Sequence, residues 1–354
     1  MNIQKLGWNE SLQNSFLAID NTGQYTVGRV MLEHKRLYRV ATETGEVLAE
    51  VSGKFRFEAT SREDFPAVGD WVVISVRESE GKATIHHLLP RFSKFSRKAP
   101  GENTEEQIVA VNVDTVFLVQ SLNYDFNPRR LERYLIMAWE SGANPVVLLT
   151  KADLCEDVQP LINEVEAVAF GVPIHVISVK EETGIEALQT YFEEGKTVAL
   201  LGSSGTGKST LTNYLIGEEK QEVKEVREDD DKGKHTTTYR ELYVLPSGGL
   251  VLDTPGMREL QLWEADNSVS QSFQDVEALA EQCQFRDCTH KNEPHCAVQL
   301  AITEGSLDNS RFQSYLKLQK ELAYLERKTN KQAQLAEKAK WKKITSSVKG
   351  KGRR

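Results

Sequence analysis

The chain has 354 residues, of which 39% are apolar and 27% are charged, and its 52 acidic and 44 basic side chains give a net charge of −8. This composition excludes an intrinsically disordered chain and, at roughly 100–200 residues per domain, predicts a soluble protein of two or three domains. No apolar run approaches the roughly 20 residues that span a bilayer, and residues 1–16 lack the basic start and apolar core of a signal peptide, so we expect a cytoplasmic protein.

The first part of the chain predicts short strands separated by glycines or acids. They cover Tyr25–Leu32, Arg36–Ala41, Val47–Val51 and Trp71–Val76. Short strands at this spacing are typical of a small barrel or sandwich. The polar residues 90–107 that follow are interpreted as a linker or a binding loop.

From Ile108 onward, apolar strands alternate with helices, which predicts a doubly wound α/β sheet. Arg129–Ser141 has the spacing of an amphipathic helix. From about residue 263 the pattern becomes helical, and it includes a Lys-rich helix over Phe312–Lys343. The predicted strands are Val113–Val119, Pro145–Leu149, Val172–Ile177, Thr197–Leu201, Leu242–Leu245 and Leu250–Leu252.

A phosphate-binding loop follows the strand that ends at Leu201. The sequence there fits G-x-x-x-x-G-K-[ST], with a helix predicted over Thr210–Ile216. Glycines let the backbone turn its N–H groups toward phosphate oxygens, and the helix N-terminus adds a positive dipole end. Lys208 is expected to neutralise the β- and γ-phosphates, and Ser209 to ligate Mg²⁺. The loop consists of Gly202, Ser203, Ser204, Gly205, Thr206, Gly207, Lys208 and Ser209, and the expected nucleotide-binding residues also include Thr210.

A second acidic motif, Asp253-Thr254-Pro255-Gly256, directly follows the apolar strand Leu250–Leu252. An acid at a strand end is where a Walker-B residue holds Mg²⁺, and the Gly256 amide is placed to bond a γ-phosphate. A plain β-turn is the alternative interpretation, since proline and glycine favour one.

Two motifs indicate guanine as the base. Thr150-Lys151-Ala152-Asp153 is similar to Asn-Lys-x-Asp, in which one carboxylate accepts from both N1–H and the exocyclic amine of guanine. The stem of Lys151 is expected to lie along the base. Ser178-Val179-Lys180 follows the next strand and is similar to the Ser-Ala-Lys motif. Thr150 departs from the usual Asn, which puts one supporting hydrogen bond in question but not the discrimination of guanine by Asp153. By itself, the first motif also fits a helix start capped by Asp153.

The order of these motifs differs from that of Ras-like domains, where the phosphate loop comes first. Here the base motifs precede the phosphate loop, which predicts a circularly permuted domain. The polar residues 218–234 are expected to form a mobile switch loop. At its end, Thr237, or else Thr236, is the expected Mg²⁺ ligand when a γ-phosphate is present.

Met257 stands where Ras-like enzymes place a water-orienting glutamine. Methionine cannot orient water, so we expect slow intrinsic hydrolysis and help from another group. His235 is the candidate catalytic residue, with an ordinary surface-loop histidine as the equal alternative.

The cysteines indicate a metal site. Cys283-x4-Cys288-x-His290-x5-Cys296 offers three thiolates and one imidazole, which suits structural tetrahedral Zn²⁺. His295 is a rival fourth ligand. Reduced buried cysteines and an iron–sulfur cluster are the other interpretations. Cys155 stands apart and is expected to be an ordinary packing or surface residue.

Charge is unevenly distributed along the chain. Residues 311–354 carry fourteen Lys or Arg and three acids, a net of +11 on an otherwise acidic protein. Such asymmetry predicts a polyanionic partner, although a solvated basic helix gives the same composition.

Together these motifs resemble the ribosome small-subunit-dependent GTPase A family (RsgA, YjeQ, YloQ). The resemblance also includes Val68-Gly69-Asp70-Trp71-Val72 in the early barrel and Gly233–Thr238, and it covers nearly the whole chain. It implies an OB-fold over residues 1–104, a permuted GTPase over 105–262, and a zinc-binding helical domain over 263–354. It further implies a monomer that binds the 30S subunit and its 16S rRNA, assists late maturation, and hydrolyses GTP with Mg²⁺ under stimulation by the subunit.

Two other functions fit parts of the sequence. One is a GTP-controlled RNA-binding switch in translation or tRNA metabolism. The other is a small-molecule kinase that uses the phosphate loop, against which Asp253–Gly256 and the guanine motif argue.

Overall fold

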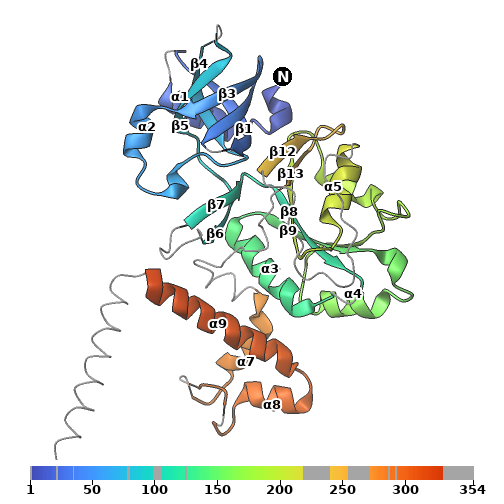
Figure 1. Ribbon diagram of the computed structural model, residues 1–354. Helices are drawn as coiled ribbons and strands as arrows, with labels where there is room; N and C mark the ends of the chain where they lie inside the picture. Colours follow the sequence, from blue (N-terminus) through green and yellow to red (C-terminus); the bar gives the residue numbers. More distant parts are fainter. Residues whose placement is uncertain are drawn as a thin grey trace, which may run out of the picture. The chain divides into compact units, whose positions relative to one another are not determined.

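The computed structural model describes residues 2–20, 23–34, 36–77, 80–98, 106–123, 126–217, 240–253, 272–285, 288–291 and 293–329 (Figure 1). The chain divides into two units. The first comprises Met1–Pro100 with Glu105–Gln261, and the second comprises Gly101–Thr104 with Leu262–Arg354.

The first unit begins with a closed five-stranded barrel. β1 pairs with both β2 and β4, β2 pairs with β3, β3 runs parallel to β5, and β5 pairs with β4. Valines and isoleucines from alternate positions fill its core, as the period of two in a strand requires. The strands are β1 (Thr26–His34), β2 (Leu37–Thr42), β3 (Gly45–Val51), β4 (Trp71–Arg77) and β5 (Lys82–Leu88). The other elements in this part are η1 (Ile3–Leu6), α1 (Glu10–Ile19), α2 (Gly53–Glu58) and η2 (Arg62–Asp64).

The interpretation of residues 90–107 as a linker or loop was wrong in part. β6 (Lys94–Lys98) lies within this segment and pairs antiparallel with β7 (Glu106–Val111). The polar composition hid the strand. Lys94 is exposed, Phe95 and Ser96 are both buried, and a register shift between those two residues interrupts the alternation that would indicate a strand.

A second sheet in the same unit is mostly parallel. It consists of the strands that the apolar runs of the sequence predicted. Every residue of β8 and β11 is buried, as in a sheet covered on both faces. β12 alone runs antiparallel to its neighbour β13. The strand order is β10 (Ile174–Val176), β9 (Asn144–Thr150), β8 (Thr115–Ser121), β11 (Thr197–Gly202), β13 (Leu250–Asp253) and β12 (Arg240–Val244).

Helices cover this sheet. α5 (Lys208–Ile216) and η5 (Glu186–Tyr191) share one apolar cluster with side chains such as Phe117 and Val119 of β8. α3 (Pro128–Ser141) packs on β8 and β9 and contributes nothing to that cluster, so it covers the opposite face together with α4 (Gln159–Glu166) (Figure 1).

The barrel and the parallel sheet are joined by strand pairing. β1 of the barrel pairs antiparallel with β12, with Leu32 opposite Glu241 and Glu33 opposite Arg240. Arg39 of β2 forms an ion pair with Glu241. The two sheets therefore form one continuous set of eleven strands.

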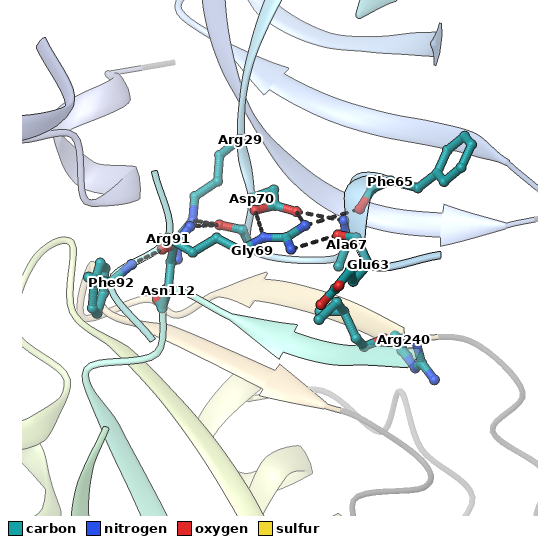
Figure 2. Close-up of polar contacts among 11 residues, drawn as sticks. Arg29, Glu63, Phe65, Ala67, Gly69, Asp70, Arg91, Phe92, Asn112 and Arg240 are labelled. Atoms are coloured by element: carbon teal, nitrogen blue, oxygen red, sulfur yellow. Dashed lines mark hydrogen bonds and ion pairs between the residues drawn. The ribbon is translucent and has the colours of Figure 1, made fainter. Parts of the chain in front are cut away.

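A buried arginine lies at the same junction (Figure 2). Arg29 of β1 is 2% exposed and donates to the carbonyl oxygens of Leu6 at 2.5 Å, Gly69 at 3.2 Å and Asn112 at 3.0 Å. Burial lowers the pKa of Arg29 to about 10, while the carboxylates of Asp114 and Asp70 oppose the change. Arg29 therefore stays charged at neutral pH and ties three separate chain segments together.

An ion pair between Arg91 and Asp70 lies beside Arg29 in Figure 2. Arg91 donates to both carboxylate oxygens of the fully buried Asp70, at 2.8 Å and 2.7 Å. Gly69 has φ +97°, and a Cβ there would meet the Val111 carbonyl oxygen at 2.3 Å. Only glycine permits this close approach, which explains the Gly-Asp pair that precedes β4.

The second unit is helical. Its described helices are α7 (Gln274–Glu281), α8 (Ala297–Glu304) and α9 (Asn309–Thr329). Arg311 of α9 donates to both carboxylate oxygens of Asp275, at 2.6 Å and 2.7 Å, and lies over the Phe273 ring. The predicted Lys-rich helix over Phe312–Lys343 is described as far as Thr329, and the remainder lies outside the described residues.

Candidate functional site: a phosphate loop, a base motif and a Cys₃His cluster

The phosphate loop lies between a buried strand and a helix. β11 ends at Gly202 and α5 begins at Lys208. Gly205 and Gly207 have φ +76° and +88°, and a Cβ on Gly202 would meet the Val119 carbonyl oxygen at 2.4 Å. The glycines are therefore required by the backbone itself, and the loop opens onto the N-terminus of α5, where anions bind.

Hydrogen bonds within the loop hold its shape. Thr206 Oγ1 donates to the carbonyl oxygen of Ser203 at 3.0 Å. Lys208 Nζ donates to the carbonyl oxygen of Gly202 at 2.7 Å and also to that of Ser203. The lysine is thus folded back over the loop, with its charge beside the backbone that phosphate oxygens would approach.

Thr150, at the position where the motif usually has Asn, is buried and hydrogen-bonded. Its hydroxyl is 2.7 Å from the carbonyl oxygen of Thr206 and 3.2 Å from that of Gln120. A hydroxyl has one proton, so the shorter contact to Thr206 is the stronger bond. The threonine therefore makes a hydrogen bond of its own between the base motif and the phosphate loop.

The two base motifs meet at Asp153. Ser178 Oγ donates to Asp153 Oδ1 at 2.7 Å, and Lys180 Nζ lies 3.9 Å from Oδ2. Lys151 has φ +60°, which turns the chain from β9 into η4 (Ala152–Leu154). The Ala152 amide donates to the Ile177 carbonyl oxygen, and Val179 packs against the apolar cluster under α5. Strand ends that are distant in sequence thus fix the direction of one carboxylate.

Several predicted site residues lie outside the described residues. These are Thr236, Thr237, His235, Thr254, Pro255, Gly256 and Met257. Asp253 is described as the last residue of β13, opposite Glu241 of β12. The predicted switch, magnesium-ligand and catalytic roles of these residues stay predictions.

Four ligand groups converge in the second unit. The donor atoms of Cys283, Cys288, His290 and Cys296 all lie within 4.8 Å of one another. Cys283 Sγ is 3.8 Å from Cys296 Sγ and 3.5 Å from His290 Nδ1, and His290 Nδ1 is 3.4 Å from Cys296 Sγ. Zn–S and Zn–N bonds of about 2.3 Å and 2.0 Å give tetrahedral edges of about 3.5–3.8 Å, so the donor set fits zinc. His295 is not a member of this group.

Contacts from neighbouring helices hold His290 in place. The His290 backbone has φ +55°, its carbonyl oxygen accepts from Gln299 Nε2 at 2.7 Å, and its ring packs edge-on to Phe312. Elements α8 and α9 therefore help to fix the cluster.

None of the helices in the described part of the chain has the length and apolar character needed to cross a bilayer.

Comparison with known proteins gives family-model matches and several close relatives over most of the chain. The family model described as RsgA GTPase matches residues 88–263, and a model described as ABC transporter matches residues 185–346, a range that includes the phosphate loop. "Small ribosomal subunit biogenesis GTPase RsgA 1" of Oceanobacillus iheyensis is 48% identical over 324 residues, 91% of this chain and 92% of that protein. "Small ribosomal subunit biogenesis GTPase RsgA" of Opitutus terrae is 45% identical over 353 residues, 97% of this chain and 96% of that protein.

Two solved structures share the fold. The crystal structure of YjeQ from Thermotoga maritima has a TM-score of 0.61 at 28% identity, and the match covers 84% of this chain and 99% of that one. The crystal structure of YloQ, described as a circularly permuted GTPase, has a TM-score of 0.60 at 24% identity, with 87% and 98% covered.

Proposed function

The chain belongs to the RsgA GTPase family, and we propose that it hydrolyses GTP to GDP and phosphate in the biogenesis of the small ribosomal subunit. The observation that carries the GTP assignment is the hydrogen bond from Thr150 to Thr206, which joins a guanine-type motif to a phosphate loop. The relatives' names carry the ribosomal assignment.

Each part of the nucleotide has a proposed partner. Asp153, held by Ser178 and Lys180, would accept from guanine N1–H and the exocyclic amine, with Lys151 along the base face. Backbone N–H groups of residues 202–210 and the charge of Lys208 would hold the phosphates. Magnesium, when bound, would supply positive charge that offsets the charge of the phosphates. We assign its ligation to Ser209, Thr237 and Asp253, a γ-phosphate contact to the Gly256 amide, and catalytic assistance to His235.

We propose the same domain layout as the sequence resemblance implies. Residues 1–104 contain an OB-fold, supported by the closed five-stranded barrel. Residues 105–262 form the permuted GTPase, supported by base motifs that precede the phosphate loop in one sheet. Residues 263–354 form a zinc domain, supported by the spacing of the Cys₃His donors.

The proposed partners are the 30S subunit and its 16S rRNA. The basic residues 311–354 supply the charge for contact with a polyanion. The protein would act as a cytoplasmic monomer in late maturation, and the subunit would stimulate hydrolysis.

Measured GTP turnover with purified 30S, 50S or bare rRNA tests the proposal. We expect slow turnover alone and stimulation by 30S, and we expect Lys208→Ala to abolish both. Stimulation by 50S or bare RNA but not by 30S would overturn the small-subunit assignment and favour a GTP-controlled RNA-binding switch.

A further inference from the structure

Arg130, which belongs to none of the nucleotide motifs, contacts the phosphate loop from a different element. It lies in the first turn of α3, and its Nη1 donates to Ser203 Oγ at 2.5 Å. The two residues are 73 positions apart in the chain. Because β11 and its loop come from a separate part of the chain, this contact exists only in the folded sheet.

The base of Arg130 is fixed by the start of the helix. Asn127 caps α3 and accepts from the amides of Arg129 at 3.0 Å and Arg130 at 3.2 Å, and Pro128 occupies the first helical position. A capped first turn begun by proline has little freedom to fray. The backbone that carries the Arg130 guanidinium is therefore rigid.

Ser203 is the residue on which the internal bonds of the loop converge. Its carbonyl oxygen accepts from Thr206 Oγ1 and from Lys208 Nζ, while its side chain accepts from Arg130. Fixing the Ser203 side chain therefore fixes the peptide group that holds the lysine. Substitution of Arg130 would therefore alter the position of Lys208 Nζ through Ser203.

The loop is thus tied at two points, from two elements. Thr150 of β9 binds the carbonyl oxygen of Thr206, and Arg130 of α3 binds the side chain of Ser203. A loop that is preformed loses less conformational freedom when it binds phosphate, so each tie contributes to affinity. The Arg130 tie is also a charge-assisted hydrogen bond, which is about twice as strong as a neutral one.

We propose that Arg130 is a positioning residue for the nucleotide, acting through Ser203 on the phosphate loop and on Lys208. The proposal rests on the proposed GTPase function. Its role is to hold the loop in the shape that receives the phosphates, so its loss weakens binding of both GTP and GDP and reduces kcat less than it raises KM.

The test uses the full chain with four variants: Arg130→Ala, Arg130→Lys, Ser203→Ala and the Arg130→Ala/Ser203→Ala double variant. Fluorescent GTP and GDP analogues give Kd, and phosphate release gives kcat and KM. We expect Arg130→Ala and Ser203→Ala each to raise Kd by about tenfold, corresponding to one lost charge-assisted hydrogen bond. The double variant should be no weaker than either single variant, and Arg130→Lys should restore part of the affinity.

Arg133→Ala, one turn further along α3, is the matched control and should leave Kd unchanged. If Arg130→Ala fails to fold, as judged by circular dichroism, Ser203→Ala still tests the contact, because it removes only a hydroxyl. A wild-type Kd in Ser203→Ala, or additive losses in the double variant, overturns the proposal. Failure of the unmodified protein to bind GTP, or a Lys208→Ala variant that binds normally, would instead contradict the proposed function.

Discussion

The hydroxyl of Thr150 donates a 2.7 Å hydrogen bond to the carbonyl oxygen of Thr206, so the motif proposed to recognise the base is attached directly to the loop proposed to recognise the phosphates. Both residues are buried, at 2% and 1% exposure, which shields the bond from competing water. The usual asparagine is therefore replaced by a shorter side chain that still makes a link.

Replacing Thr150 by valine should weaken nucleotide binding. Valine has the same shape but no hydroxyl, so the buried Thr206 carbonyl loses its donor at a cost of about 1–3 kcal/mol. We expect the Kd for GTP, measured by titration, to rise about tenfold or more. Thr150→Ser keeps the hydroxyl and should bind nearly as the unmodified protein does. Equal binding by the valine variant would show that the link contributes nothing to affinity.

Removal of the metal should affect the second unit selectively. Cys283→Ser deletes one of four donors that lie within 4.8 Å, and structural zinc sites contribute folding free energy directly. We expect elemental analysis to find about one zinc per chain in the unmodified protein and less in the variant, with lower helical content but retained GTP binding. Cys155→Ser is the control, since Cys155 lies outside the cluster, and it should keep its zinc. Full zinc occupancy in Cys283→Ser would exclude this donor set.

Substitutions of Arg29 and Arg39, both at the junction between barrel and sheet, should differ greatly in their effect on stability. Arg29→Met leaves three backbone carbonyls without their donor in a buried site, and we expect a loss of about 3–5 kcal/mol in the free energy of unfolding. Arg39→Met removes ion pairs to Glu241 and Glu46, but the arginine side chain is 35% exposed, and we expect a loss of about 1 kcal/mol or less. Urea unfolding of both variants measures the difference. Similar losses in the two would contradict the assigned role of burial.

Gln120 is the one position where we expect a substitution to stabilise the protein. It lies in β8, is 1% exposed, and neither amide atom of its side chain has a hydrogen-bond partner in the part of the chain that the structure describes. Replacing a buried amide of this kind by the similarly sized methionine should raise the free energy of unfolding by about 1–2 kcal/mol. A lower melting temperature in Gln120→Met than in the unmodified protein would contradict this prediction.

Local sequence patterns were sufficient to predict the nucleotide motifs, because each has its strand, turn and helix within a few residues. The Gly202–Ser209 loop and its flanking elements fall where expected, and so do most strands of the parallel sheet. The Cys₃His spacing selected the four residues whose donors converge, because their ligand atoms come from one short segment.

Contacts between distant segments were not predictable in this way. Arg130 carries no motif, and only the packing of α3 on the sheet brings it to Ser203. Arg29 lies in β1, where residues 27–31 are all buried, and nothing near it in sequence indicates that it binds carbonyl groups as far away as Asn112. The polar residues of β6, among them the exposed Lys94, concealed a strand whose partner, β7, begins at Glu106.

The pairing of β1 with β12 sets a limit on how the protein can be divided. Cutting the chain after residue 104, where the sequence pattern changes, would remove the partner of β12 and leave backbone N–H and C=O groups of Arg240 and Glu241 open to solvent. An uncovered strand edge of this kind invites pairing with other chains and aggregation. Arg29 would also be lost, leaving the Asn112 carbonyl without its donor. The smallest piece that should fold independently is therefore the barrel together with the parallel sheet.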